Sequence, residues 1–278
     1  MKFFEFVRKP QGWFGLILIG IFWPLNWCLP GTRTAYLFFP LWLGYILVMD
    51  ALVLTRRGDS LLSRSPLQFV LLFVLSAPAW WLFEWINSRT HNWKYMGGNQ
   101  FTGLEYFILS SVSFSTVMPS VFESAEFMRS LPVMQRLEKG PHVSARPWMR
   151  LSCLAVGAIM FWLTWRWPRT CYPFVWTSLV LILEGINGLL RRPCFLDYLH
   201  QGDWRPVVAL ALGALLCGFF WEMWNYYSFP KWVYDTPGVK DPCLFEMPLL
   251  GYLGYIPFAW ELYGLRNLLW PWRQHLKL

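Results

Sequence analysis

Long apolar runs separated by short polar and basic stretches dominate the pattern along the chain. A helix needs about 20 mainly apolar residues to cross the hydrocarbon core of a bilayer. The pattern therefore predicts an all-α polytopic membrane protein with about eight transmembrane helices, several of them interrupted by proline or glycine. The expected segments are Trp13–Leu29, Ala35–Thr55, Leu67–Asn87, Leu104–Met128, Leu151–Arg166, Tyr172–Leu190, Val207–Tyr226 and Leu244–Leu265.

The composition supports a membrane environment. Of the 278 residues, 56% are hydrophobic, 20% are aromatic and 14% are charged. Ordinary globular domains carry about 25% charged residues, so a soluble fold could not bury this much apolar surface. The twenty tryptophans agree, because indole rings favour the membrane–water interface.

The net charge of +8 is spread in small clusters between the apolar runs. With the N-terminus inside, seventeen of the 24 Lys and Arg residues fall in inside segments, which is the asymmetry of a correctly oriented membrane protein. We therefore expect an integral protein of a bacterial inner membrane, with both termini cytoplasmic. Because no basic patch forms, no nucleic-acid partner is expected.

An internal repeat divides the sequence. The segments that match at a nearly constant offset are 83–87 with 221–225, 93–95 with 232–234, 104–105 with 245–246, 119–123 with 257–261, and Asp50 with Glu184. An even number of helices per copy makes the repeats parallel. We expect a first four-helix repeat over residues 1–130, a basic cytoplasmic linker over 131–147 and a second four-helix repeat over 148–278.

Acidic side chains lie in two layers of these segments. Ionisable groups at membrane depth are costly, which makes them candidates for function. The outer layer holds Glu84, Asn87 and Glu105, with their repeats Glu222, Asn225 and Glu246. The inner layer holds Asp50, Glu123, Glu184 and Glu261, close in sequence to arginines that would form ion pairs with them.

The outer acids lie among aromatic residues, foremost Trp93, Tyr95, Trp232 and Tyr234. A carboxyl group in an apolar pocket can stay protonated and act as an acid. Aromatic faces stabilise a nearby cation. This combination suits carbocation chemistry on an isoprenoid, with Glu84, Glu105, Glu222 and Glu246 as catalytic candidates. In the alternative interpretation, these polar groups only hydrogen-bond between helices.

The sequence contains no motif typical of a metal or cofactor site. The four histidines are scattered, and none pairs with another at the spacing of four residues that a zinc or haem site on a helix would use. Nucleotide-binding and serine-hydrolase motifs are also missing from suitable contexts. We therefore expect neither a zinc site nor a haem.

The second copy reads Glu222-Met223-Trp224, Trp232-Val233-Tyr234, Pro242 to Leu250, then Pro257 and Trp260-Glu261. This order resembles the small membrane lycopene cyclases of the tandem or heterodimeric kind, which do not use flavin. The family has a Glu-Glu doublet where this chain has single glutamates, Glu105 and Glu246. The resemblance implies a distant relative with a changed substrate or reaction. It also implies isomerisation without net redox change, and therefore neither a metal nor a consumed cofactor.

The leading hypothesis is an intramembrane enzyme that acts on an isoprenoid- or carotenoid-like lipid by glutamate acid–base chemistry. Glu246 or Glu105 would protonate a double bond, and Glu222 or Glu84 would remove a proton. The substrate would contact Asn87, Trp93, Tyr95, Glu123, Asn225, Trp232, Tyr234 and Glu261. Two alternatives remain: a non-catalytic lipid- or pigment-binding protein, or a structural subunit of a membrane complex. A transporter ranks below these. Expected partners are therefore a membrane lipid and, beyond it, a second copy or a larger membrane complex.

Overall fold

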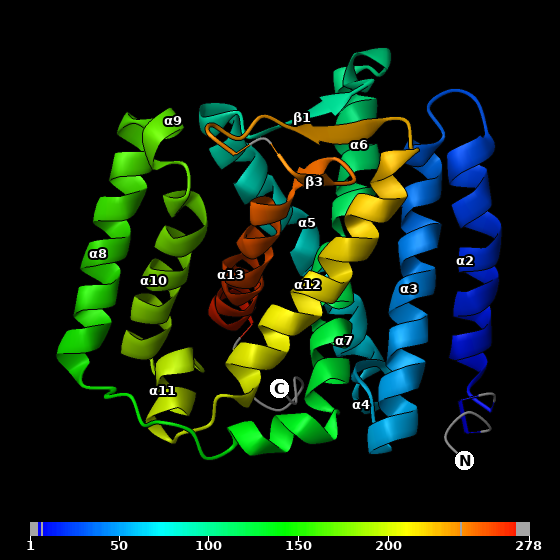
Figure 1. The fold of residues 1–278 in the computed structure, drawn as a ribbon. Helices are drawn as coiled ribbons and strands as arrows, with labels where there is room; N and C mark the ends of the chain where they lie inside the picture. The colour runs from blue at the N-terminus through cyan, green and yellow to red at the C-terminus, as the bar shows by residue number, and fades with distance from the viewer. Residues whose placement is uncertain (1–4, 7, 240, 271–278) are drawn as a thin grey trace.

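The computed structural model describes residues 5, 6, 8–239 and 241–270, and it is mostly helical (Figure 1). The first half contains α2 (Pro10–Cys28), α3 (Thr34–Arg57), α4 (Leu61–Arg64), α5 (Pro66–Thr90), β1 (Trp93–Met96), η1 (Gly98–Gln100), α6 (Gly103–Phe114), α7 (Val117–Arg129) and η2 (Pro132–Leu137). The second half contains α8 (Pro147–Arg166), α9 (Pro168–Cys171), α10 (Phe174–Leu189), α11 (Phe195–His200), α12 (Arg205–Tyr226), β2 (Lys231–Tyr234), β3 (Cys243–Leu244), β4 (Met247–Pro248), η3 (Leu249–Gly254) and α13 (Tyr255–Leu269).

Within the described residues, four helices are long and apolar enough to cross a membrane, namely α3, α5, α8 and α12. The other expected segments also form helices, but two of these are broken. Residues 104–128 form α6 and α7, and residues 244–265 begin as short strands and a 3-10 turn before α13. Pro119 and Pro257 lie in the first turns of α7 and α13, where a proline ring prevents the helix from continuing from the preceding residues because it clashes with the carbonyl group four residues earlier.

Local signals fix where the helices begin. Proline lies in the first turn of α2, α5, α8 and α12, where the missing N–H would have no partner in any case. The side chains of Ser60, Ser65 and Thr102 accept hydrogen bonds from backbone N–H groups at the starts of α4, α5 and α6. At the end of α3, Gly58 takes a left-handed conformation with φ of 80°, which stops the helix.

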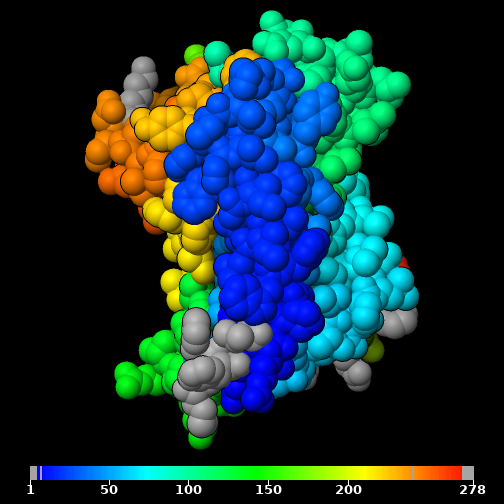
Figure 2. Space-filling view, turned by 90° about the vertical axis from the view of Figure 1, so that its right-hand side faces the viewer, coloured from blue at the N-terminus to red at the C-terminus, as the bar shows by residue number. Residues whose placement is uncertain are grey.

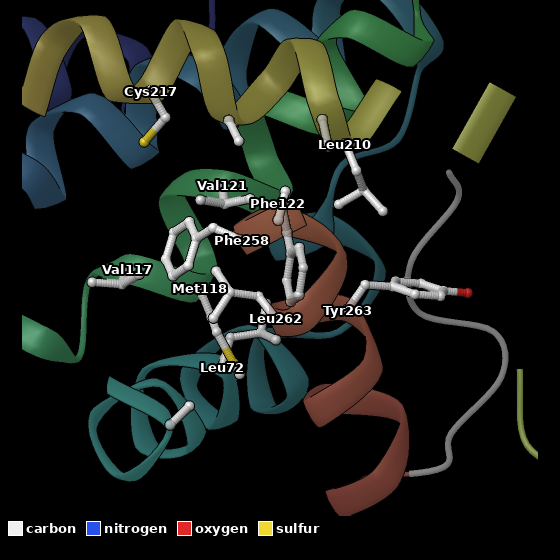
Figure 3. Close-up of a cluster of buried hydrophobic side chains, with 14 of the residues drawn as sticks. Leu72, Val117, Met118, Val121, Phe122, Leu210, Cys217, Phe258, Leu262 and Tyr263 are labelled. Atoms are coloured by element: carbon white, nitrogen blue, oxygen red, sulfur yellow. The ribbon is translucent and has the colours of Figure 1, made fainter. Parts of the chain in front are cut away.

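Helices α5, α7, α12 and α13 form the centre of the bundle, and the hairpins α2–α3 and α8–α10 lie on either side of it (Figure 1). Buried apolar side chains from the four central helices meet in one cluster (Figure 3). Members of this cluster include Leu72 of α5, Phe122 of α7, Leu210 of α12 and Leu262 of α13. The core therefore lies where the two halves of the chain contact each other.

Glycines allow the two helices of each outer hairpin to approach closely. A Cβ atom at Gly15 of α2 would lie 2.6 Å from the carbonyl oxygen of Gly44 of α3, so a larger residue would force these two helices apart. A Cβ atom at Gly157 of α8 would lie 2.8 Å from the carbonyl oxygen of Ser178 of α10, so the same holds for this pair of helices. Small residues of this kind are common where membrane helices pack. In Figure 2, α2 runs along the middle of the face of the molecule that is turned to the viewer.

A two-stranded antiparallel ribbon covers the end of the bundle opposite to the start of α2 (Figure 1). Strand β1 comes from the first half and β2 from the second. Trp93 lies opposite Tyr234, and Tyr95 lies opposite Trp232. The ribbon therefore joins the two matching Trp-x-Tyr segments of the sequence side by side. The hydrophobic pattern did not predict strands here.

Candidate functional site: an aromatic cavity with two glutamate cradles

A cavity of about 180 Å³ lies beneath the β1–β2 ribbon, between the two halves of the chain. Its wall is mainly aromatic, and among the described residues Lys231 is the one charged side chain that lines it. The aromatic lining residues are Phe38, Trp80, Trp93, Tyr95, Phe101, Tyr106, Phe114, Trp176, Trp221, Trp232, Tyr234, Tyr255 and Phe258. Such a wall favours an apolar, unsaturated or cationic ligand.

Glu84 of α5 lies directly behind this wall. One of its carboxyl oxygens, Oε1, accepts three hydrogen bonds from rings that line the cavity. The indole N–H groups of Trp80 and Trp93 donate at 2.8 and 3.1 Å, and the hydroxyl of Tyr95 donates at 2.6 Å. Trp80 can reach Glu84 because residues four apart share one face of a helix. We call this set the first cradle.

Glu222 of α12 has the corresponding position in the second half. Its Oε1 accepts hydrogen bonds from the indole of Trp232 at 3.3 Å and from the hydroxyls of Tyr234 and Tyr255, both at 2.6 Å. The whole Glu222 side chain is buried. Its second oxygen, Oε2, is buried without a hydrogen-bond partner in the described part of the chain. We call this set the second cradle.

Two asparagines hold the ribbon above the cavity. The side-chain amide of Asn87 donates to the carbonyl of Trp93 at 2.9 Å, and its oxygen accepts from the Trp93 N–H at 3.2 Å. Asn225 binds the backbone of Trp232 in the same way, at 2.7 and 3.0 Å. Each Glu-x-x-Asn pair therefore fixes one Trp-x-Tyr strand through both its side chains and its backbone.

The cradles give the rings a defined electrostatic character. A phenol or indole that donates a hydrogen bond to a carboxylate gains electron density, because bonded groups polarise one another in a low-dielectric interior. The negative face of such a ring attracts a cation. The rings of both cradles face one cavity, so the arrangement can stabilise positive charge on a molecule bound there.

The remaining two catalytic candidates lie elsewhere. Glu105 is exposed, and its carboxylate accepts from the N–H and the hydroxyl of Thr102, both at 2.8 Å, as part of a capping box at the start of α6. Glu246 forms an ion pair with Lys231, whose ammonium group lies 5.7 Å from the centre of the Tyr226 ring. Glu246 thus reaches the rim of the cavity through Lys231.

The inner candidates Glu123 and Glu261 are fully buried in α7 and α13, away from the cavity lining. Neither carboxyl oxygen of either residue has a hydrogen-bond partner among the residues that the structure describes. The arginine ion pairs expected for them are therefore not formed. In this region an ion pair joins Arg64 to Glu126 instead.

Several cavity residues were not among the predicted site residues. Trp80 had a usable signal, since it stands four positions before Glu84. Tyr255 and Trp176 had none, because an aromatic residue in an apolar run is indistinguishable from ordinary core. Lys231 directly precedes the Trp-x-Tyr segment of the second half, which was a further usable signal.

Comparison with known proteins identified no relative of this chain. No protein-family model, no curated protein sequence and no solved structure matches the chain.

Proposed function

We propose that this chain is an intramembrane enzyme that converts an isoprenoid- or carotenoid-like apolar lipid by acid–base chemistry, without net redox change. The observation that carries the proposal is the pair of cradles. Six ring donors from the wall of one cavity converge on two glutamates, the half-buried Glu84 and the fully buried Glu222. The resemblance of the repeated segments to the small membrane lycopene cyclases points to the same chemistry.

In the proposed reaction, a proton adds to a carbon–carbon double bond and leaves a carbocation on the neighbouring carbon. The polarised rings of Trp93 and Trp232 stabilise that cation. Loss of a proton from an adjacent carbon then forms a new double bond, so the product is an isomer of the substrate. Protons would pass between Glu84 or Glu222 and the substrate through a tyrosine hydroxyl, because Tyr95, Tyr234 and Tyr255 lie between the carboxyl groups and the cavity.

The membrane arrangement is part of the proposal. We propose eight spans, organised as two parallel four-helix repeats over residues 1–130 and 148–278, with residues 131–147 and both termini in the cytoplasm of a bacterium. The four span-length helices and the matching hydrogen-bond sets of Glu84 and Glu222 support it. The β1–β2 ribbon would then lie at the outer surface.

Conservative substitution of the cradle glutamates tests the enzyme directly. Glu84→Gln and Glu222→Gln keep size and hydrogen bonding but remove the charge. Removal of one group that stabilises transition-state charge lowers kcat by about 10²–10³, so each variant should lose turnover of a prenyl substrate in membranes. Glu105→Gln is the control, because its side chain caps α6 at the surface. Full turnover in the Glu84→Gln/Glu222→Gln double variant would refute the proposal.

A second candidate function is non-catalytic binding of a lipid or pigment. It is favoured by the absence of a carboxyl group from the lining formed by the described residues. A binding protein would carry the same bound lipid in wild type and in the double variant. An enzyme would carry different lipids in the two.

A further inference from the structure

The two cradles differ in the origin of one hydrogen-bond donor. In the first cradle this donor is the indole of Trp80, which lies on the same helix as Glu84 and donates at 2.8 Å. In the second it is the hydroxyl of Tyr255, which lies at the start of α13 and donates to Glu222 at 2.6 Å. The other two donors of each cradle are the tryptophan and the tyrosine of a ribbon strand, so they are of the same kind in both.

The sequence repeat shows that this difference is an exchange of large and small residues. At the offset that relates Glu84 to Glu222, Trp80 corresponds to Gly218, and Val117 corresponds to Tyr255. The first half thus has its large ring on the helix of the glutamate and a small residue on the neighbouring helix. The second half has the reverse order.

Gly218 makes room for the Tyr255 ring. A Cβ atom at Gly218 would lie 2.5 Å from Cδ2 of this ring and 2.9 Å from its Cζ. Carbon atoms in contact prefer separations of about 3.5–4.0 Å, so a larger residue would displace the ring from Glu222. The Tyr255 ring also stacks on Trp221, with centroids 5.8 Å apart and planes 26° from parallel. Packing therefore holds the phenol in place together with its hydrogen bond.

The exchange changes the chemistry that each cradle can support. A phenol hydroxyl can accept as well as donate, whereas an indole N–H is only a donor. Glu222 has two phenols and one indole on one oxygen, and Glu84 has one phenol and two indoles. An indole ring offers the best aromatic face for a cation. The second cradle is therefore suited to proton transfer, and the first to stabilisation of charge.

Burial and position agree with this division. The Glu222 side chain is fully buried, and its second oxygen has no partner in the described part of the chain, whereas Glu84 is half-buried. Tyr255 lines the cavity, so it stands between Glu222 and a bound molecule. Tyr234 has a similar position, but its equivalent Tyr95 is present in the first cradle. Tyr255 is thus the phenol that distinguishes the second cradle from the first.

We propose that the two cradles divide the reaction between them. Tyr255, supported by Glu222, is the catalytic residue that transfers the proton, and the indoles of Trp80 and Trp93 stabilise the cation. This assignment rests on the proposed function and names the group that performs its proton-transfer step.

The proton-transfer steps balance without an oxidant or a reductant. In the first step, the π electron pair of the double bond takes the hydroxyl proton of Tyr255, while the Tyr255 oxygen takes the proton of the Glu222 carboxyl group. In the second step, the Tyr255 oxygen takes a proton from a carbon next to the cation, and the electron pair of that C–H bond forms the new double bond. The former hydroxyl proton of Tyr255 returns to Glu222, so both residues regain their initial state.

Transfer of deuterium tests the assignment. The probe is the lipid extracted from the Glu84→Gln/Glu222→Gln double variant, returned to each purified protein in lipid nanodiscs prepared in D₂O. Wild type should convert this lipid and place deuterium on the product. Positioned acid–base groups contribute about 10²–10⁴-fold, so Tyr255→Phe should lower both conversion and deuterium incorporation by about that factor. Trp80→Phe should convert the lipid more slowly than wild type, with the same deuterium content in each product molecule.

Two further variants separate the lost hydroxyl from lost packing. Gly218→Trp/Tyr255→Val gives the second cradle the residues of the first and replaces a phenol donor by an indole, so it should be as slow as Tyr255→Phe. Tyr263→Phe is the control, because it removes a hydroxyl from another tyrosine of α13. That hydroxyl lies 3.1 Å from Tyr198, and Tyr263 is outside the cavity lining formed by the described residues. This variant should convert the lipid at the rate of wild type.

The outcomes distinguish this assignment from the proposed function. Conversion by Tyr255→Phe within about tenfold of wild type would overturn the role of Tyr255 and leave the proposed function intact. An equal loss in Tyr263→Phe would show that any buried hydroxyl of α13 matters, and would overturn the role of Tyr255 as well. A wild type that converts nothing would refute the proposed function, and this assignment with it.

Discussion

The hydroxyl of Tyr234 donates a 2.6 Å hydrogen bond to Glu222, and this bond attaches strand β2 of the ribbon to helix α12. The first half repeats the relationship at the same distance, with Tyr95 and Glu84. Both tyrosine rings line one cavity. The two halves of the chain therefore contribute equivalent groups to a single site.

Loss of one cradle donor should weaken function without unfolding the protein. Tyr234→Phe removes the hydroxyl but leaves the other two donors of Glu222, Trp232 and Tyr255, in place. We expect turnover of the bound lipid to fall by about tenfold to a hundredfold, because transition-state charge loses part of its stabilisation. Tyr252→Phe is the control, since among the described residues its hydroxyl binds the carbonyl of Leu244 and not a cradle glutamate. Equal activities of the two variants would show that the cradle bond has no role in the reaction.

Removal of an asparagine that holds the ribbon should lower stability. Asn225→Ala leaves the N–H and the carbonyl of Trp232 without their side-chain partners. Each unsatisfied buried group costs about 1–3 kcal/mol, so the loss of both partners should lower the free energy of unfolding by about 2–6 kcal/mol. Chemical unfolding in detergent measures the change. Asn99→Ala, at an exposed position in η1, should have almost no effect, and an equal loss there would argue against the role of Asn225.

The α8–α10 contact depends on a missing side chain. Gly157→Ala would place a Cβ atom 2.8 Å from the backbone of both Ser178 and Ile182, so the helices must move apart. Overpacking of this kind costs about 1–3 kcal/mol of unfolding free energy. Gly20→Ala meets nothing within 4 Å and should not destabilise the protein. Thermal unfolding of the two variants in detergent would reveal the difference, and identical curves would show that α8 and α10 do not pack this closely.

Labelling of single cysteines tests the orientation in the membrane. Lys94 of the ribbon and Arg136 of η2 are both exposed, at opposite ends of the bundle. In a chain without the exposed Cys28 and Cys243, a membrane-impermeant maleimide should label Lys94→Cys in intact cells. Arg136→Cys should be labelled only after the cells are permeabilised. The reverse result would place the termini outside the cytoplasm.

The pattern of apolar runs predicted the helices well, because helix length and hydrophobicity are local properties. It did not predict the ribbon, because strands of four residues in a loop leave only a weak alternation, Trp-x-Tyr, in the sequence. The breaks near Pro119 and Pro257 were visible as prolines. Their effect on the path of the chain was not visible.

The candidate site was predicted in part. Glu84 and Glu222 were named together with the rings Trp93, Tyr95 and Trp232, and the structure places them in hydrogen-bond contact. Sequence could not rank these two glutamates above Glu105 and Glu246, because all four lie near helix ends. The capping pattern Thr102-x-x-Glu105 was a local signal that Glu105 serves its own helix. The ion pair of Glu246 with Lys231 depends on how the loop folds back, which no local pattern encodes.

The central claim is that Glu84 and Glu222 act together on one lipid bound between the two halves of the chain. Mass spectrometry of the organic extract from gently purified protein tests it most directly, with wild type beside the Glu84→Gln/Glu222→Gln double variant. The account predicts a polyene or prenyl lipid in both samples, chemically converted in wild type and unconverted in the variant. The same unaltered lipid in both samples, or phospholipid alone, would contradict it.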